Sequence, residues 1–270
     1  MYRLGLSPNQ PCDYLPGRSA RHLVVIDQHL LDPAGYDELL FQGYRRSGSH
    51  FYRPWCQHCR RCVAVRIPVH HFRPDRAQRR ARKRNADLEA IWRPAHALDD
   101  EHWRLYHAYL QARHGDGQMA KAGRAESESF LFSPMMKTEL LELRLNGELV
   151  AVAVTDVQPR SLSALYTFFH PDHAQRSLGT LAIQLQVAEA RRRGLRWLYL
   201  GYWIGPCRKM SYKERFLPLE VRRSEAHPRL ERWRRLDDRA AVQAFDEALD
   251  AEDFHFERHW PFESDLTTPT

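Results

Sequence analysis

The sequence contains no long hydrophobic run. A membrane-spanning helix needs about 18 consecutive apolar residues, and no such stretch occurs anywhere in the 270 residues. The first thirty residues also lack the apolar core of a secretory signal peptide. We therefore expect a cytoplasmic protein with no membrane partner.

Cysteine is scarce, and its number is odd. Five cysteines do not suit a disulfide framework, and they fit a reducing compartment better. The sequence also has no internal repeat, no low-complexity linker and no G-x-S-x-G nucleophile motif. Its length allows one large domain or two small ones, with enough residues to bury a core.

Positive charge is concentrated in one segment. The net charge is +7, and RPDRAQRRARKR (73–84) holds six Arg and one Lys against one Asp. In contrast, residues 246–265 carry eight carboxylates and one Arg. Such a basic block predicts a polyanionic partner, most simply a nucleic acid, although a solvated helix face is the alternative.

Hydrophobic periodicity predicts an α/β chain. A basic helix is expected over 74–90 and a second helix over 99–114. Two apolar runs flank Asn146-Gly147, which predicts a β-hairpin over 138–157. A strand (161–169), a helix (176–194) and a further strand (196–203) complete the pattern. This order resembles the GNAT acyltransferase core, whose central sheet is mixed.

The same patterns divide the chain into three parts. We expect a small cysteine-bearing domain over 1–72, a GNAT-like catalytic domain over 73–235 and an acidic C-terminal segment over 236–270. Within the second part, RSLGTL (176–181) is similar to the loop by which acetyltransferases bind a pyrophosphate at a helix N-terminus. Leu181 departs from that pattern, and an ordinary coenzyme A acetyltransferase would leave the basic block unused.

Three cysteines follow C-x-x-C-x-x-C spacing. Cys56, Cys59 and Cys62, with Cys12 as a fourth ligand, would suit zinc or an iron–sulfur cluster. His58 is a spare ligand for zinc, and Cys207 is not expected to join the group. The alternatives are a set of reduced thiols that shape a substrate pocket, or a zinc-bearing module that binds nucleic acid.

Six motifs carry a family resemblance. They are PCDYLPGR (11–18), GYRRSGSHFYRPWCQHCRRCVAVRIPV (43–69), RAQRRARKRN (76–85), LYHAYLQARHGDGQM (105–119), LYTFFHPDHAQRSLGTLAI (165–183) and LYLGYWIGPCRKMSYKERFLPLE (198–220). In this order they resemble the aminoacyl-tRNA–protein transferases of the N-degron pathway. The resemblance is nearer to the bacterial aspartate/glutamate leucyltransferases than to the longer arginyltransferases.

The resemblance implies a reaction. Leucine would pass from leucyl-tRNA to the free amine of a protein that begins with Asp or Glu, and the new N-terminus would be a degradation signal. Arginyl-tRNA is the alternative donor. The aminoacyl ester is already activated, so direct aminolysis would need no cofactor. The resemblance also favours an oxygen-sensitive iron–sulfur cluster over zinc on the cysteines.

Three tasks need side chains. To hold tRNA, we expect the 73–84 block, Arg176 and the stacking aromatics Tyr166, Phe168 and Phe169. To bind an acidic N-terminal residue, the candidates are Arg45, Arg46, Arg76, Arg79 and Arg80, with Arg76 and Arg80 preferred. To assist the leaving ribose oxygen and the oxyanion, the candidates are Tyr212, Lys209, Lys213 and Tyr202.

Overall fold

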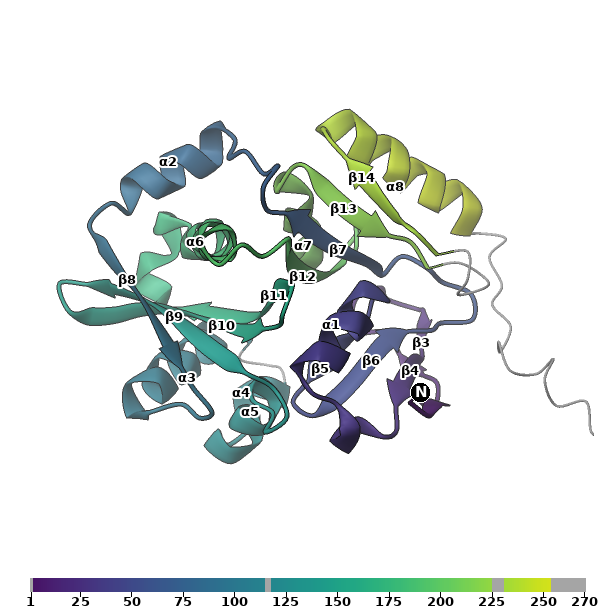
Figure 1. Ribbon diagram of the computed structural model, residues 1–270, viewed down its shortest axis with the longest axis horizontal. Coiled ribbons are helices and arrows are strands. Elements are labelled where there is room, and N and C mark those ends of the chain that lie inside the picture. Colours follow the sequence, from purple (N-terminus) through teal and green to yellow (C-terminus); the bar gives the residue numbers. More distant parts are fainter. Residues whose placement is uncertain (1, 115–117, 225–230, 254–270) are drawn as a thin grey trace, which may run out of the picture.

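The computed structural model describes residues 2–114, 118–224 and 231–253, and it is built around two sheets (Figure 1). The small sheet has the strand order β1-β4-β6-β5, and the large sheet has the order β14-β13-β7-β12-β11-β10-β9-β8. Two short strands, β2 and β3, form a separate ribbon. Every helix in these ranges is too short or too polar to cross a membrane.

The N-terminal residues build the small sheet and its covering helix. The elements are β1 (Leu4–Leu6), β2 (Gln10–Pro11), β3 (Ser19–Ala20), β4 (His22–Val25), η1 (Gln28–Leu30), α1 (Pro33–Phe41), β5 (Arg45–Ser47) and β6 (His50–Pro54). Helix α1 begins where the Asp32 side chain accepts the Gly35 N–H at 2.7 Å. Its Tyr36 and Leu40 are fully buried against Phe51, so the helix and the sheet share one core.

The large sheet is mixed. Its strands are β7 (Val63–Pro68), β8 (Leu88–Pro94), β9 (Thr138–Leu145), β10 (Glu148–Val157), β11 (Ser161–Phe169), β12 (Trp197–Trp203), β13 (Leu219–Arg222) and β14 (Trp233–Leu236). Strands β11 and β12 are parallel, whereas the other neighbours are antiparallel. The β9–β10 hairpin turns at Asn146 and Gly147, both with positive φ, as the sequence predicted.

Helices cover both faces of the large sheet (Figure 1). They are α2 (Arg76–Arg84), α3 (Asp100–His114), α4 (Gln118–Lys121), α5 (Arg124–Leu131), η2 (Pro171–Arg176), α6 (Leu178–Arg192), α7 (Arg208–Ser211), η3 (Tyr212–Arg215) and α8 (Arg239–Asp253). Ile183 and Val187 of α6 pack against Leu198 and Leu200 of β12. The side chains of α3 and α5 form a separate core with Val152 of β10 and Phe168 of β11.

The predicted fold class is confirmed. Hairpin, strand, helix and parallel strand follow one another as expected for a GNAT-like core, and a smaller cysteine-bearing part precedes them. Two helices are shorter than predicted. The basic helix ends at Arg84, because residues 88–94 form an edge strand, and the helix expected from residue 176 begins as the 3-10 segment η2.

The predicted division of the chain differs from the structure in two places. Strand β7 was assigned to the N-terminal domain, yet it pairs with β12 and β13 inside the large sheet. The acidic segment begins with α8, whose Val242, Phe245 and Leu249 are buried in the core of that sheet. Residues 254–270 of this segment lie outside the described residues. Both ends of the chain thus contribute to the large sheet and its core.

Candidate active site

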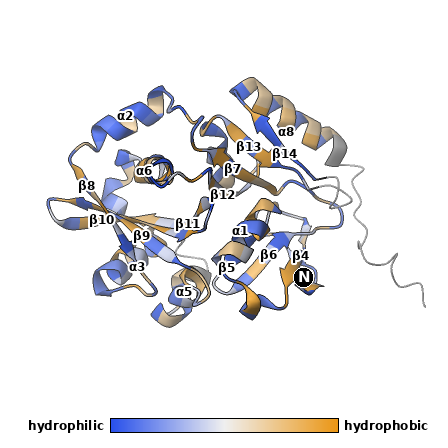
Figure 2. Cartoon of the chain, viewed as in Figure 1, coloured by the Kyte–Doolittle hydropathy of each residue, from blue (hydrophilic) through white to orange (hydrophobic). Residues whose placement is uncertain are grey.

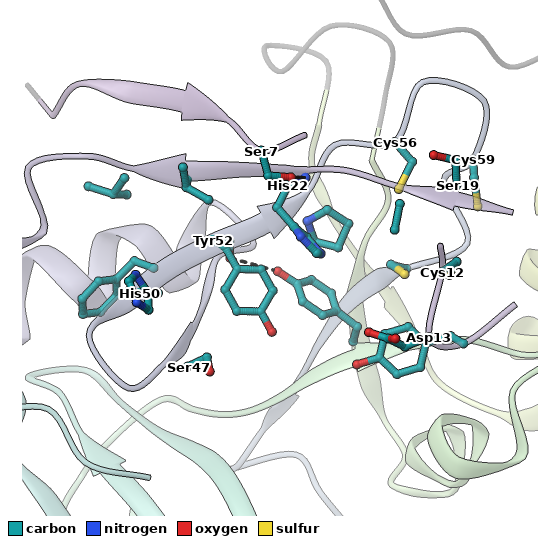
Figure 3. A pocket seen from close by; sticks show the side chains of 18 of the residues that line it. Ser7, Cys12, Asp13, Ser19, His22, Ser47, His50, Tyr52, Cys56 and Cys59 are labelled. Carbon is teal, nitrogen blue, oxygen red and sulfur yellow. Dashed lines mark hydrogen bonds between the residues drawn. The ribbon is translucent and has the colours of Figure 1, made fainter. Parts of the chain in front are cut away.

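A cavity of about 560 Å³ lies beside the small sheet. The strand registers place His22, Val24 and Tyr52 on the face of β4 and β6 that forms one wall. Strand β3 and the loop that joins β2 to β3 form another wall (Figure 3), and Tyr202 of β12 contributes from the large sheet. Tyr14 also lines the cavity while remaining 39% exposed, so this side is open to solvent.

Four thiols line the same cavity. They are Cys12, Cys56, Cys59 and Cys62, and none of them is in a disulfide. Burial, followed by the neighbouring thiols, raises the pKa of Cys62 well above its usual value. Among the described residues, no three His, Cys, Asp or Glu side chains are arranged to hold a metal ion. The predicted metal ligands are thus brought to one cavity without forming a metal site in this arrangement.

Arg45 lies between the cavity wall and the large sheet. It pairs in register with Tyr52 and precedes Ser47 by two residues, and both of these residues line the cavity. Residues opposite each other or two apart share one face of a sheet, so Arg45 shares a face with Tyr52, although Arg45 itself is not among the residues that line the cavity. Its Nη1 donates to Ser163 Oγ at 2.6 Å, and its Nη2 donates to the Ala164 carbonyl at 2.7 Å. Both acceptors are uncharged.

Arg46 faces the opposite direction and is not available to a substrate. Its Nε and Nη2 bind the two carboxylate oxygens of Asp156 at 2.7 and 2.5 Å, and neither side chain has exposed surface. Nη2 also donates to the Leu131 carbonyl. The prediction that Arg46 binds substrate is therefore corrected: strand alternation turns it into the protein interior.

Lys213 and Tyr202 form a buried pair next to Arg45. The Lys213 ammonium group donates to the Tyr202 carbonyl oxygen. Burial, followed by the charge of Arg45, lowers the pKa of Lys213 to about 7. The Tyr202 hydroxyl donates to the carbonyl of Gly43 at 2.9 Å, so it is engaged within the fold. The predicted role of Tyr202 as a proton donor to substrate is therefore not supported by its contacts.

Tyr212 is the accessible member of the predicted catalytic group. It is 42% exposed, and its ring centre lies 5.5 Å from the Lys213 nitrogen. Lys209 is exposed on α7. A short segment after β12 thus supplies a partly exposed tyrosine, whose pKa is still raised to about 12 by burial, beside a buried amine that is partly neutral near pH 7.

The predicted stacking aromatics have different environments. Tyr166 is half-buried and meets Tyr106, Tyr109 and Phe130 edge-on, with ring centres 5.7 to 6.3 Å apart. Phe169 is also partly exposed, and the Arg113 guanidinium lies 5.1 Å from its ring centre. Phe168 is fully buried in the core, so its predicted stacking on a base is corrected.

The basic helix lies away from the cavity. Figure 1 shows α2 over α6, at the opposite end of the molecule from the small sheet. The Asp75 side chain and Gln78 form its capping box, while Gln78 and Ala81 face the protein. Most of the helix is coloured as hydrophilic in Figure 2, since six of its nine residues are Arg or Lys. Arg76, Arg79 and Arg80 are all exposed and do not line the cavity, and the preference for Arg76 and Arg80 as ligands of the acidic residue stays a prediction.

Arg176 lies next to the C-terminal end of α2. Its two Nη atoms bind Asp87 at 2.9 Å each, and its carbonyl accepts from the Asn85 side chain. Arg84 of α2 donates to the neighbouring Gln175 carbonyl. These contacts join α2 to the start of α6, so the two predicted phosphate-binding elements form one basic surface.

Two residues at the site had no place among the sequence predictions. Tyr52 lines the cavity opposite Arg45, and Tyr109 packs between Tyr166 and Phe169. The sequence HFYRP (50–54) could have indicated Tyr52, because alternate residues of a strand face opposite sides of the sheet. The contacts of Tyr109 depend on how α3 packs on β11, which local sequence does not specify.

Comparison with known proteins gives two family matches and close relatives. The model "Arginine-tRNA-protein transferase, N terminus" matches residues 10–80, and the model for its C terminus matches residues 101–223. The aspartate/glutamate leucyltransferase of Pseudomonas aeruginosa is 48% identical over 211 residues, which cover 78% of this chain and 89% of that protein. The enzyme of the same name from Stenotrophomonas maltophilia is 50% identical over 225 residues, with 81% and 89% covered.

Solved structures are more distant. L-PGS from Bacillus licheniformis has a TM-score of 0.39 at 13% identity and matches 52% of this chain and 45% of that one. A fungal GCN5-related glucosamine N-acetyltransferase region has a TM-score of 0.37 at 11% identity and matches 60% and 20%. At these scores neither structure supports an argument about this site.

Proposed function

The chain belongs to the arginine-tRNA-protein transferase family, and from this premise we propose that it transfers leucine from leucyl-tRNA to proteins beginning with Asp or Glu. The observation that carries the proposal is the similarity to aspartate/glutamate leucyltransferases, which extends over most of both chains. The partners would be aminoacyl-tRNA and an acidic protein N-terminus. Because both occur in the cytoplasm, we propose that location.

We propose direct aminolysis as the reaction. The neutral α-amine of the acceptor attacks the ester carbonyl carbon, a C–N bond forms, and the C–O bond to the tRNA ribose breaks. Of the protons on the original ammonium group, one leaves before attack and one ends on the ribose oxygen. The ester is already activated, so the main tasks are positioning, proton transfer and stabilisation of the oxyanion.

The site residues support this division of tasks. The Tyr212 hydroxyl, on a partly exposed side chain, is able to donate to the leaving oxygen or the oxyanion, and Lys209 is an exposed cation on the preceding helix α7. The exposed arginines of α2 and the Arg176 surface suit tRNA phosphates, since Arg forms forked contacts with them. Tyr166 and Phe169 are partly exposed and offer aromatic faces for the terminal adenine.

We also propose that the four cavity thiols bind an iron–sulfur cluster, with zinc as the alternative. An all-sulfur donor set suits either metal, but the side chains must move to converge on one centre. The cluster would be structural or regulatory, because aminolysis needs no metal. Anaerobic purification followed by iron, sulfide and zinc analysis tests this. Cys59→Ser should lose the metal and Cys207→Ser should keep it; equal and low metal content in all three proteins would leave the reduced thiols as pocket residues.

The proposed function is tested by transfer of labelled amino acid to peptides that begin with Asp, Glu or Ala. Charged leucyl-tRNA and arginyl-tRNA each serve as donor, and the enzyme is purified both in air and anaerobically. We expect leucine on the Asp and Glu peptides alone. Transfer from arginyl-tRNA instead would change the donor and keep the mechanism. No transfer from either donor in both preparations would refute the proposal.

A further inference from the structure

Arg45 differs from four other buried arginines in lacking a negative partner. Within the described ranges, no carboxylate lies within salt-bridge distance of its guanidinium, and its bonds to Ser163 and Ala164 are to neutral oxygens. Its side chain is nonetheless buried, and the whole residue is only 8% exposed. Other buried arginines do have acids: Arg46 with Asp156, Arg53 with Glu231, Arg61 with Asp246, and Arg66 with Glu220.

The side chains next to Arg45 supply hydroxyl groups. Among the described residues that line the cavity, Asp13 alone carries a carboxylate, and its charge acts on Tyr52. Burial raises the pKa values of Tyr36, Tyr52, Tyr202 and Tyr212, and the charge of Arg45 opposes each increase. These phenols therefore remain neutral at pH 7. A buried cation without a counter-charge is costly, so this arrangement suits a site whose ligand brings the negative charge.

The backbone leaves room for this guanidinium. Gly201 of β12 has a φ of +81°, and a Cβ at this position would lie 3.2 Å from Arg45 Nε. The Nε of Arg45 makes no hydrogen bond to any residue in the described part of the chain. One of the N–H donors of the Arg45 guanidinium therefore remains available to a ligand. A carboxylate can accept two parallel N–H bonds from such a fork.

We infer that Arg45 binds the side-chain carboxylate of the acceptor's first residue and thereby determines the preference for acidic N-termini. This inference rests on the proposed function. The acceptor's first residues enter the cavity beside β4 and β6, where Tyr52 and Ser47 line the wall next to Arg45. The volume of about 560 Å³ admits either Asp or Glu. The exposed arginines of α2 remain for tRNA.

Lys213 provides a readout that a purely structural role of Arg45 would not affect. The charged and titratable groups that act on Lys213 are Arg45, Cys62 and Cys207, and the Tyr212 ring lies beside it. Burial lowers the pKa of Lys213 to about 7, and Arg45 is the second cause of this shift. A carboxylate bound to Arg45 offsets that second cause, so the pKa of Lys213 rises and a proton is taken up near pH 7.

The test is calorimetric binding of tetrapeptides without tRNA. The peptides begin with Asp, Glu, Asn or Gln and carry a C-terminal amide, so the first side chain supplies the only carboxylate. Titrations at pH 7 in two buffers with different ionisation enthalpies give the number of protons taken up. The proteins are wild type, Arg45→Met, Arg45→Lys and Arg104→Met, the last being an exposed arginine of α3 that serves as control.

We expect wild type and Arg104→Met to prefer Asp over Asn and Glu over Gln, and to take up protons only with the two acidic peptides. Arg45→Met should reduce the Asp-to-Asn preference by about 30-fold or more, the usual cost of truncating one partner of a buried charge pair. Arg45→Lys should keep part of the preference. If Arg45→Met does not fold, the test uses the wild type alone. The affinity and the proton uptake are then compared between the Asp peptide and the Asn peptide.

Two outcomes separate this inference from the proposed function. If wild type transfers leucine but Arg45→Met retains the full Asp-to-Asn preference, Arg45 does not bind the acidic side chain. If no leucine is transferred but acidic peptides bind in an Arg45-dependent manner, the carboxylate site stands and the proposed reaction fails.

Discussion

Arg46 of β5 and Asp156 of β10 form a two-pronged ion pair in which neither side chain has exposed surface. The pair joins the small sheet to the large one. Arg46→Met should lower the free energy of unfolding by roughly 3–5 kcal/mol, because it leaves a buried carboxylate without its cation. Urea denaturation followed by tryptophan fluorescence measures this decrease.

The matched control for Arg46 is Arg176→Met. Arg176 pairs with Asp87 at the surface, where solvent screens the charges, so its removal should change stability far less. Equal destabilisation by the two substitutions would mean that the buried pair has no special role in joining the sheets.

Lys213 should make stability depend on pH in a predictable direction. Its pKa is about 7 in the folded chain and near 10.5 when unfolded, so between these values only the unfolded state binds the proton. The wild type should therefore gain stability relative to Lys213→Met as the pH rises from 7 to 10.5, by about 1.4 kcal/mol per pH unit.

Urea denaturation of both proteins at pH 7, 8 and 9 measures this difference. Other titrating groups cancel when the two curves are subtracted. A difference that does not change with pH would show that Lys213 keeps an ordinary pKa in the folded protein.

The exposed arginines of α2 should contribute to tRNA affinity by neutralising phosphates. The double variant Arg79→Met, Arg80→Met should bind tRNA more weakly, and log K should depend less steeply on log[salt], by about one unit for each phosphate that the variant no longer neutralises. Filter binding across a salt series gives both quantities. An unchanged slope, matching that of Arg104→Met, would place the tRNA on another surface.

Helix α8 should be part of the stable core. Leu249 is fully buried against the large sheet, so Leu249→Ala should cost about 2–5 kcal/mol of unfolding free energy. Glu247→Ala, on the exposed face of the same helix, should change stability by no more than about 0.5 kcal/mol. Thermal unfolding compares the two, and similar melting temperatures would mean that α8 is dispensable.

Local patterns predicted the parts of the fold that depend on neighbouring residues. The Asn146-Gly147 turn, the strands beside it and the helix before Gly194 were correct because turn chemistry and periodicity act over a few residues. The position of β7 was not predictable in this way. Its partners β12 and β13 lie far along the chain, and pairing between them depends on the whole sheet.

The candidate site shows the same limit. Arg45 and Arg46 are consecutive and chemically identical, so sequence alone could not rank them. Their difference arises because adjacent residues of a strand face opposite sides, one toward Ser163 and one toward Asp156. The preference for Arg76 and Arg80 stays a prediction, and it meets the same limit: the charge of a helix indicates the charge of its partner but not the distance of the helix from the cavity.

The position of β7 also has a consequence for biosynthesis. Residues 63–68 leave the ribosome early, but their partners at 197–203 and 219–222 emerge more than a hundred residues later. During that interval β7 has two open edges made of buried, mostly apolar residues. A nascent chain in this state invites non-native strand pairing, so we expect synthesis of this protein to depend on cellular chaperones until residue 222 has emerged.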